Sequence, residues 1–309
     1  MKNEYEIIPN PQIKHIHCFV NDITYRNFHT HNNFELLLIL DGKGIINVGN
    51  RSYNVKKADI ILINPNEPHE INGRVICCIL QISRQFCSTY FQQLKNTLFR
   101  TEHINPYLSN AEAYKLGSEI ISATLNYVQR NNYFELLCTK TVLEILYIIL
   151  QKIPHDTMST SEYISYNKKV DRLNRISSFI DSNYQEPIRL ETIAKSENLT
   201  VTYLSHFFKD CFGVTFQEYL NNKRFEQAMR LIPRKDLNLT QISDLCGFSD
   251  IKYLNKMFQK RLGVKPQQFR DNMDSVIKSD ENTQQNILEY KYNEAESIRV
   301  LTDFLSAVC

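Results

Sequence analysis

The chain has 309 residues and a mass of 36.4 kDa, which is long enough for two domains with separate hydrophobic cores. Apolar residues at 42% and charged residues at 23% are typical of globular proteins and exclude a disordered or fibrous chain. The net charge of +2 is unevenly distributed. Residues 170–271 carry 16 basic and 12 acidic residues (+4), whereas residues 272–309 carry 3 and 7 (−4). The basic segment favours an anionic partner.

No apolar run approaches the length of a membrane-spanning helix, and residues 1–6 carry acidic side chains without the apolar core of a secretory signal. We therefore expect a soluble, cytoplasmic protein with no membrane partner. The eight cysteines include no C-x-x-C pair, which excludes a zinc ribbon or a thioredoxin motif. We expect them to be free thiols that are mostly buried.

Residues 13–83 predict a domain of antiparallel β-strands. Short β-branched or apolar segments alternate there with turn residues: Asp41-Gly42, Gly49-Asn50 and Pro65-Asn66. The expected strands cover residues 34–40, 44–48, 59–64 and 75–82. Many short strands at this spacing are typical of an antiparallel barrel or sandwich.

Two helices are predicted after the strands, over residues 114–129 and 134–151. The second is apolar on more than one face, so we expect it to pack against two neighbours. The barrel and a second subunit of a homodimer are natural candidates, although a core within one chain would give the same pattern. Residues 154–168 are polar, rich in Ser and Thr and contain a proline, which predicts an interdomain linker after a first domain of residues 1–153.

An internal repeat within residues 169–272 is the most informative feature of the chain. Its copies, at about residues 190–213 and 239–263, each predict a short helix, a tight turn and a second helix. The corresponding positions, 49 to 50 residues apart, are Ile193 and Ile242, Leu199 and Phe248, Tyr203-Leu204 and Tyr253-Leu254, Phe208 and Phe258, and Gly213 and Gly263. Gly247 permits the second turn, and Ser249 or Asp250 can cap the helix that follows. This pattern predicts two helix-turn-helix motifs, whose second helix enters the DNA major groove.

The candidate DNA-binding residues lie between the apolar positions of each second helix. They are Thr202, Ser205, His206 and Lys209 in the first copy, and Ile251, Lys252, Asn255, Lys256 and Lys260 in the second. Asn and Lys hydrogen-bond base edges, Ile can contact a thymine methyl group, and Lys suits phosphates. One helix over residues 215–232 would join the motifs, so that they read successive major grooves of double-stranded DNA about 34 Å apart.

The second copy belongs to a longer pattern: Ile242-x-x-Leu245-x-Gly247-Phe248-Ser249-Asp250-x-x-Tyr253-Leu254-x-x-x-Phe258-x-Lys260-x-x-Gly263-x-x-Pro266-x-x-Phe269-Arg270. This pattern resembles the signature of the bacterial AraC/XylS-type transcriptional regulators. The resemblance implies a DNA-binding regulator, not an enzyme, that controls RNA polymerase at promoters, most often as an activator. It also implies an N-terminal domain that binds a small-molecule effector or mediates dimerisation.

The resemblance implies a two-domain α+β fold. An N-terminal cupin-like antiparallel β-barrel with flanking helices would precede a C-terminal all-α domain with two helix-turn-helix motifs. Residues 273–309 extend past the usual end of the family as an acidic C-terminal extension, with one helix predicted over residues 287–308. Its negative charge raises the question of whether it covers the basic DNA-binding surface.

The segment His29-Thr-His31-Asn-Asn-Phe-Glu35 resembles the first motif of the cupin superfamily, and Pro65-Asn-Glu-Pro68-His69 resembles a degenerate second motif. In metal-binding cupins the corresponding residues bind a divalent ion, so the set that this resemblance implies is His29, His31, Glu35 and His69. Regulators of the AraC type commonly keep this pattern without using a metal, and we expect no cofactor. We expect the effector pocket to include His31, Glu35 and His69, and further candidates are Tyr25, Arg26 and Phe28.

Two other functions remain open from the sequence. One is a metal-dependent cupin enzyme with an appended helical domain, since the ligand set is chemically complete. The other is a DNA-binding regulator without an effector, controlled by its abundance or by a protein that binds the barrel. The sequence names neither the effector nor the operator.

Overall fold

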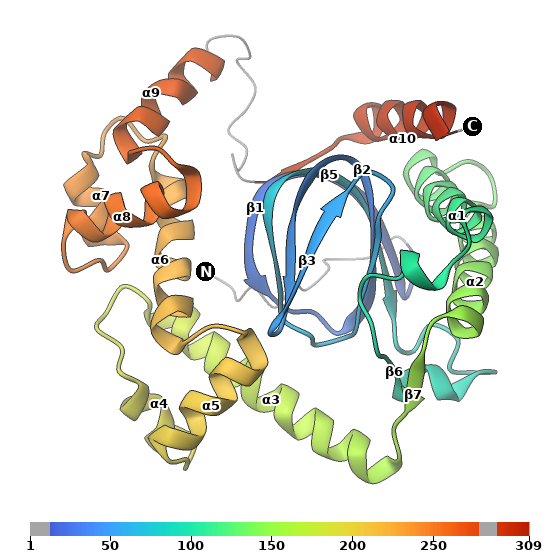
Figure 1. Ribbon diagram of the computed structural model, residues 1–309, viewed down its shortest axis with the longest axis horizontal. Coiled ribbons are helices and arrows are strands. Elements are labelled where there is room, and N and C mark those ends of the chain that lie inside the picture. The colour runs from blue at the N-terminus through green and yellow to red at the C-terminus, as the bar shows by residue number, and fades with distance from the viewer. Residues whose placement is uncertain (1–12, 278–288, 309) are drawn as a thin grey trace. The chain divides into compact units, whose positions relative to one another are not determined.

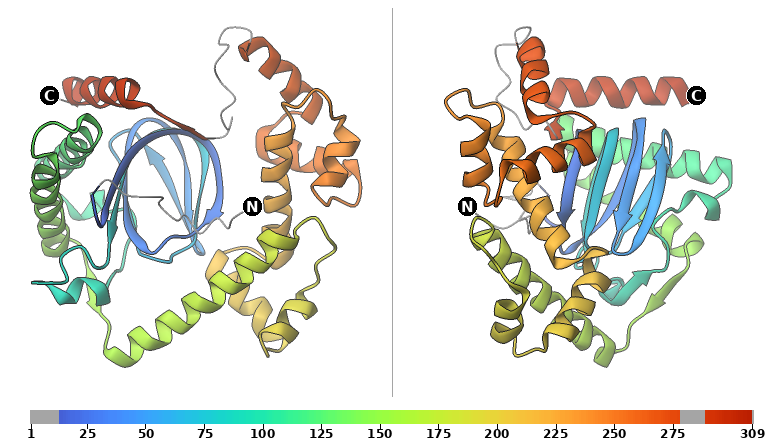
Figure 2. Two further views of the ribbon diagram at one scale, coloured as in Figure 1. Left: turned by 180° about the vertical axis from the view of Figure 1, so that it is seen from behind. Right: turned by 60° about the vertical axis from the view of Figure 1, so that its left-hand side comes forward.

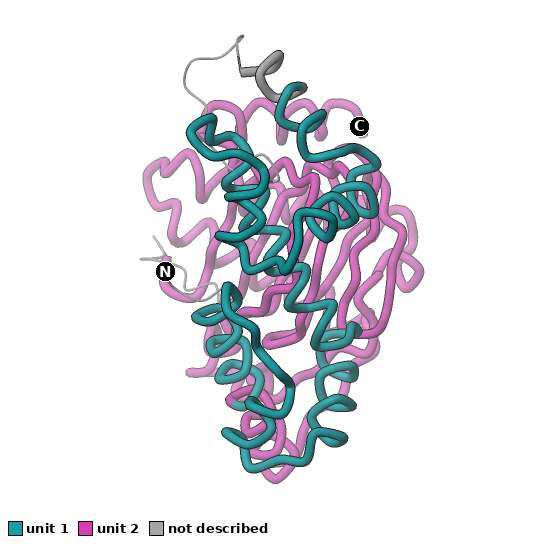
Figure 3. The backbone as a smooth tube through the Cα atoms, turned by 90° about the vertical axis from the view of Figure 1, so that its left-hand side faces the viewer, with its two compact units in different colours: residues 1–4, 172–288 teal, residues 5–171, 289–309 magenta. Residues whose placement is uncertain are grey.

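The chain folds into two units, which Figure 1 and Figure 3 show in a computed structural model. The structure describes residues 13–277 and 289–308. Of these, residues 13–171 and 289–308 form one unit, here called the barrel unit, and residues 172–277 form the helical unit. No helix among the described residues is both long enough and apolar enough to cross a membrane.

The barrel unit is built on a curved antiparallel sheet. Its strands are β1 (Ile16–His29), β2 (Asn33–Val48), β3 (Arg51–Lys56), β4 (Ile60–Ile63), β5 (His69–Ser83) and β8 (Glu289–Lys291). The order is β3-β2-β5-β1-β8, and β4 pairs with β2. Since every pairing is antiparallel, side chains alternate between the inside of the barrel and its outer face.

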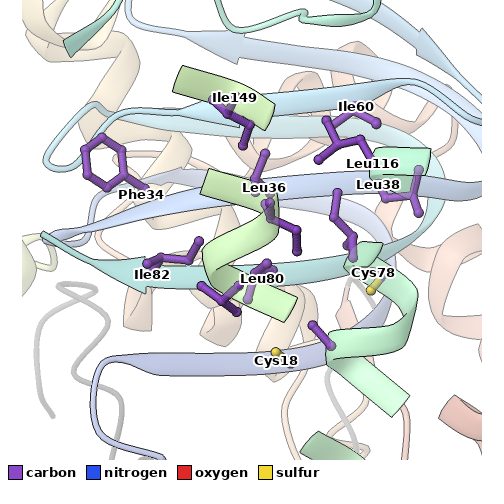
Figure 4. Packing of buried hydrophobic residues seen from close by; sticks show 14 of the residues in the cluster. Cys18, Phe34, Leu36, Leu38, Ile60, Cys78, Leu80, Ile82, Leu116 and Ile149 are labelled. Atoms are coloured by element: carbon purple, nitrogen blue, oxygen red, sulfur yellow. The ribbon is translucent and has the colours of Figure 1, made fainter. Parts of the chain in front are cut away.

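Strand β2 shows this alternation and carries both cores. Leu37 and Ile39 belong to an inner core made by strands alone, whereas Leu36 and Leu38 belong to an outer core shared with helices. Figure 4 shows Leu36, Leu38 and Leu80 of the outer core beside Leu116 and Ile149, which come from the helices. A strand buried on both faces needs an almost continuous apolar run, which explains the sequence of residues 36–40.

The prediction of two separate strands at residues 34–40 and 44–48 was wrong, because β2 runs through both. Asp41-Gly42 is not a turn but follows an irregularity in the pairing with β5, between Ile39 and Asp41. Gly42 has φ +85°, and a Cβ atom there would lie 2.2 Å from the carbonyl oxygen of Arg74. The glycine therefore serves a close approach of two strands rather than a chain reversal.

Two antiparallel helices cover the outer face of the sheet, α1 (Asn110–Gln129) and α2 (Phe134–Lys152), as Figure 2 shows. A capping box between Ser109 and Glu112 starts α1. The buried side of α2 consists of Cys138, Val142, Ile145, Leu146 and Ile149. Flanking helices were expected from the sequence, and their bounds agree with the prediction to within a few residues.

The segment predicted as a linker, residues 154–168, is instead packed on the barrel unit. Strand β7 (His155–Thr157) pairs with β6 (Thr97–Phe99), and helix α3 (Thr160–Asn183) begins directly afterwards. Tyr166 of α3 donates a hydrogen bond to the carbonyl of Pro65. The Ser/Thr-rich composition reflects a helix start, since Ser159 and Glu162 bond to each other as a cap, and not a flexible connection.

The acidic C-terminal segment also belongs to the barrel unit. Residues 289–291, expected to be helical, form strand β8 beside β1, and the helix that follows, α10, covers only Glu294–Val308. Leu301 and Phe304 of α10 are buried in the outer core. Residues 278–288 and 309 of the predicted extension lie outside the described residues. The edge of β1 provides backbone groups that can pair with another strand, and residues 289–291 pair there although the sequence predicted a helix.

The helical unit contains the two predicted helix-turn-helix motifs. The first consists of α4 (Leu190–Ser196) and α5 (Val201–Phe212), and the second of α7 (Leu239–Leu245) and α8 (Ile251–Leu262). Between them runs α6 (Phe216–Leu231), the joining helix predicted from the sequence, and α9 (Pro266–Ile277) follows. Gly213 and Gly263 end α5 and α8 with φ +68° and +69°.

Helix α6 contacts both motifs, as its central place in the helical unit in Figure 1 indicates. At its start, Tyr219 lies against Phe208 and Phe212 of α5, with ring centroids 5.3 and 4.6 Å apart. Further along, Phe225 lies 5.1 Å from the ring of Phe258 in α8. Arg261 of α8 also donates a hydrogen bond of 2.7 Å to Asn222 of α6.

The loop before α4 fixes the second motif through backbone contacts. Arg224 of α6 donates hydrogen bonds of 2.8 and 2.9 Å to the carbonyls of Tyr184 and Glu186. Between them, the carbonyl oxygen of Gln185 would lie only 2.5 Å from a Cβ atom on Gly247, whose φ is +79°. Glycine in the second turn is therefore required both by its φ and by a neighbouring backbone.

Replacing Leu301 by alanine will lower the free energy of unfolding of the barrel unit by about 2–5 kcal/mol, because it leaves a cavity in the outer core. Asp303→Ala, at an exposed position of the same helix, is the matched control and should change it by less than about 0.5 kcal/mol. Urea unfolding of the full chain measures both. Equal stability of the two variants would contradict a structural role of α10.

The variants Gly247→Ala and Gly263→Ala distinguish the two reasons for glycine in the second motif, which are the positive φ and the close approach of a neighbouring backbone. Both add a side chain at positive φ, which costs roughly 1–2 kcal/mol. Only at Gly247 does the new Cβ atom meet backbone, since nothing lies within 4 Å at Gly263. Gly247→Ala should therefore destabilise the helical unit by about 1–3 kcal/mol more than Gly263→Ala in thermal unfolding. An equal loss in both variants would exclude the contact with Gln185.

Candidate DNA-binding surface and histidine cluster

Helix α5 presents the predicted polar positions of the first motif to solvent. Thr200 caps the helix by accepting a hydrogen bond from the Tyr203 amide. The buried positions are Leu204, Phe207, Phe208, Cys211 and Phe212. The four predicted DNA-binding residues are all exposed: Thr202, Ser205, His206 and Lys209. They occupy the side of α5 that the core does not use.

Helix α8 repeats this arrangement with more positive charge. Asp250 is the cap, as predicted, and it accepts a hydrogen bond of 2.8 Å from the Lys252 amide. Leu254 and Phe258 are fully buried. Of the predicted residues, Ile251 is half-buried at the start of the helix, and four are exposed: Lys252, Asn255, Lys256 and Lys260.

The lysines on these two helices are not used in the fold. Lys209, Lys252 and Lys256 form no ion pair with any residue that the structure describes. Two basic residues of α6, in contrast, are paired: the buried Lys223 lies 3.0 Å from Asp181, and Arg230 pairs with Glu226. The exposed ammonium groups are therefore available to phosphates or base edges.

The tyrosines of the repeat lie on the same exposed surface, which the sequence analysis missed. Tyr203 and Tyr253 were grouped with the apolar positions of their helices, but they are 49% and 55% exposed. Each occupies the third position after its cap residue, Thr200 or Asp250, directly before the buried Leu204 or Leu254. A signal was present, since a tyrosine recurs at this position in both copies and carries a polar hydroxyl group.

Three histidines and a glutamate form a second candidate site inside the barrel unit, here called the histidine cluster: His29, His31, Glu35 and His69. His29, at the end of β1, is the cross-strand partner of His69, at the start of β5. Glu35 lies in β2, on the same face of the strand as the inner-core residues Leu37 and Ile39. The structure thus brings together all four residues that the cupin resemblance implied.

The rings of the histidine cluster are in mutual contact. The His29 and His69 centroids lie 4.0 Å apart, and those of His31 and His69 lie 5.2 Å apart. Nε2 of His31 is 3.0 Å from Oε2 of Glu35, and Nε2 of His69 is 3.3 Å from Oε1. Gln81 donates a further hydrogen bond of 2.8 Å to Glu35.

Backbone carbonyls hold the other nitrogen of each imidazole. The Nδ1 atoms of His29, His31 and His69 lie 2.9, 3.1 and 2.9 Å from the carbonyl oxygens of Asn27, Asn33 and Glu67, respectively. A carbonyl oxygen only accepts hydrogen bonds, so each Nδ1 carries the hydrogen and donates it. All three Nε2 atoms consequently face the centre of the cluster, within 4.8 Å of one another.

Burial shapes the electrostatics of this cluster, whose four side chains are at most 6% exposed. Burial, with smaller contributions from Arg26 and His69, holds the pKa of His29 well below its usual value, which favours the neutral ring. Burial would raise the pKa of Glu35, but the charge and hydrogen bond of His31, with the hydrogen bond and charge of His69, outweigh it. The pKa of Glu35 is therefore well below its usual value.

The weaker pocket candidates make contacts outside the four residues of the cluster. Arg26 pairs with Glu289 of β8 at 2.8 Å, and the Tyr25 hydroxyl donates to the side chain of Asn27. Phe28 is buried. Arg26 is thus used, together with Asn21, to attach the C-terminal strand to β1.

Comparison with known protein families identifies both units. The family model described as AraC-like ligand binding domain matches residues 16–72, and the model described as helix-turn-helix domain matches residues 193–272. The first covers most of the barrel strands and the histidine cluster, and the second covers both predicted motifs. A helix-turn-helix domain beside a domain of the AraC-like ligand-binding kind favours a regulator over a cupin enzyme.

Similar proteins carry the same description. The chain is 20% identical over 269 residues to an uncharacterized HTH-type transcriptional regulator of Staphylococcus aureus strain MRSA252, covering 86% of this chain and 34% of that protein. It is 33% identical over 95 residues to the uncharacterized HTH-type transcriptional regulator YijO of Escherichia coli K12, covering 31% and 34%. The chain thus spans about a third of the length of these relatives.

Among solved structures, ToxT of Vibrio cholerae is similar, with a TM-score of 0.45 and 15% identity over 84% of this chain and 98% of that one. One chain thus combines a unit that is similar to the AraC-like ligand binding domain, over residues 16–72, with a unit that is similar to a helix-turn-helix domain, over residues 193–272.

Proposed function

We propose that this protein binds promoter DNA through the exposed faces of α5 and α8, and that a ligand held in the barrel unit regulates this binding. The observation that carries the proposal is the duplicated arrangement in the helical unit. Two capped helices bury equivalent apolar stripes and expose equivalent polar ones, and both pack on α6. Such a pair can enter two successive major grooves as one rigid reader.

The proposed DNA contacts are of two chemical kinds, contacts with base edges and contacts with phosphates. Lys252, Asn255 and Lys256 lie near the start of α8, the part of a recognition helix that reaches base edges. Lys209 and Lys260 lie in the last turns of their helices and suit the phosphate backbone. The first motif has a single lysine at its candidate positions, so α8 supplies more of the base-specific contacts and α5 supports them.

The regulator acts as a homodimer in this proposal, with α2 as the contact. Opposite its buried side, α2 exposes Leu136 (70%), Leu137 (42%) and Tyr147 (57%), and Tyr133 at its cap is 76% exposed. Leu136 and Tyr147 lie about three helical turns apart on this side, with the partly buried Leu143 and the exposed Lys140 between them, so α2 has an outward apolar stripe that one lysine interrupts. Exposed apolar stripes of this kind are typical of association surfaces.

A promoter-bound dimer would act on RNA polymerase, and we propose activation as its effect. The barrel unit supplies the regulatory input. Its candidate ligand residues, His31, Glu35 and His69, are buried and contact one another, so an organic effector would have to separate them. The match of this unit to a ligand-binding family favours an effector over control by abundance alone.

Lys252→Ala and Lys256→Ala should each weaken specific DNA binding by about 1–3 kcal/mol, because each removes a base contact. The measurement is fluorescence anisotropy on an operator selected from a random duplex pool. Lys195→Ala is the matched control: it removes the same charge from an exposed position of α4 in the same unit. Its loss should be small and independent of DNA sequence. If all three variants lost affinity equally, the lysines of α8 would contribute charge and not sequence reading.

Leu136→Lys should convert the dimer into a monomer, because it replaces the most exposed apolar side chain of α2 by a charge. Ile45→Lys introduces the same charge at another exposed apolar position, on β2, and should leave the dimer intact. Sedimentation equilibrium of the full chain measures the mass of both variants. A dimer that survives Leu136→Lys would place the contact elsewhere.

A further inference from the structure

The histidine cluster contains buried nitrogen atoms that the protein itself does not satisfy. Nε2 of His29 has no hydrogen-bond partner, and Nε2 of His69 has only a long contact of 3.3 Å with Oε1 of Glu35, although both side chains are almost fully buried. Buried polar atoms without a good partner cost free energy, and native structures contain few of them. Two such nitrogen atoms beside a carboxylate indicate a site that a ligand could complete.

The hydrogen-bond pattern around the rings determines what can complete the cluster. Since each Nδ1 donates to a backbone carbonyl, a ring that loses its Nε2 proton directs the Nε2 lone pair toward the centre of the cluster. Histidines that bind metals show this arrangement, with the distal N–H fixed by a carbonyl or a carboxylate. Here the backbone fixes all three rings in this way.

The remaining groups supply charge and a further ligand. Glu35 places its two oxygen atoms 3.0 and 3.3 Å from Nε2 of His31 and His69. Ligand atoms around a tetrahedral zinc ion are about 3.3 Å apart, given metal–ligand bonds of about 2.0–2.1 Å. The two distances between Glu35 oxygen atoms and histidine nitrogen atoms already have about this value. The histidine nitrogen atoms lie within 4.8 Å of one another, and small rotations of the rings would bring them close enough to bind one ion.

A purely structural role explains this cluster less well. Glu35 is already held by His31 and Gln81, with His69 at 3.3 Å, and none of these contacts uses Nε2 of His29. A partly satisfied polar network is worse for stability than an apolar core of the same shape. An apolar core does fit beside the cluster, because Leu37 and Ile39, the next two residues on the same face of β2 as Glu35, belong to the inner core.

We propose that His29, His31, His69 and Glu35 bind one divalent transition-metal ion. Three imidazoles and one carboxylate suit zinc, iron, nickel or cobalt rather than calcium or magnesium, which prefer oxygen ligands. The proposal departs from our expectation of no cofactor. It deepens the sensor role under Proposed function, and rests on it, by naming a metal ion as the class of ligand that the barrel unit holds.

The test is direct titration of the metal-free full chain with Co²⁺ and Zn²⁺ under reducing conditions. We expect one equivalent of Co²⁺ to produce a saturable visible absorption band, and Zn²⁺ to displace it. Metal analysis after gel filtration should give one ion per chain. A wild-type chain that takes up no stoichiometric metal would overturn the proposal, and this result does not depend on the folding of any variant.

Two variants assign the site. His29→Gln and His69→Gln should each lower Zn²⁺ affinity by more than about 100-fold, the upper end of the loss caused by removing an outer partner of a metal ligand. His155→Gln is the matched control, because its Nδ1 also lies 2.9 Å from a backbone carbonyl, that of Ile153, but its side chain is exposed. Unchanged affinity in both cluster variants would place the metal elsewhere and overturn the assignment.

DNA binding is measured separately on the same samples. Sequence-specific DNA binding by a protein that takes up no metal would overturn the metal site and leave the proposed regulator intact. Stoichiometric metal with no specific DNA binding would support the site and contradict the proposed function. The failures of the two proposals are thus distinguishable.

Discussion

The helical unit depends on one constraint, the packing of both recognition helices against α6. Tyr219 at its start holds α5 through two aromatic contacts, and Phe225 two turns later holds α8. Because α6 is a single helix of 16 residues, these contacts fix the spacing of the two motifs as well as their existence. Everything that the unit can read on DNA follows from this geometry: the capped helix starts, the exposed lysines and the exposed tyrosines all lie on sides that α6 leaves free.

The barrel unit depends in a similar way on β2, whose side chains serve two cores. One face supplies Leu36 and Leu38 to the helices, and the other supplies Leu37 and Ile39 to the interior, where Glu35 continues the same row. The histidine cluster is therefore continuous with the inner core, and a displacement of its side chains would be transmitted to the strands through the close packing. The C-terminal segment closes the unit, since β8 pairs with β1 and α10 buries Leu301 in the outer core.

Much of the site was readable from the sequence because its residues repeat at fixed intervals. Eight of the nine predicted DNA-binding positions are exposed, and Ile251 is half-buried. Tyr203 and Tyr253 were misplaced because an aromatic ring beside buried positions looks like a core residue when only periodicity is considered. The four residues of the histidine cluster were also named, but their arrangement was not: cross-strand pairing of His29 with His69 brings together residues 40 positions apart.

The sequence by itself determined the class of each unit, the duplicated motif and the joining helix, and it limited the cap of α8 to Ser249 or Asp250, since these depend on local periodicity and on residues close in the chain. Only the tertiary structure decided the course of β2 through Asp41-Gly42, the packing of residues 154–168 on the barrel, and the return of residues 289–308 to the barrel unit. Each of these depends on a partner far away in the chain: β5, β6 or the edge of β1. Pairing between distant strands is set by the free energy of the whole sheet, which no local pattern records.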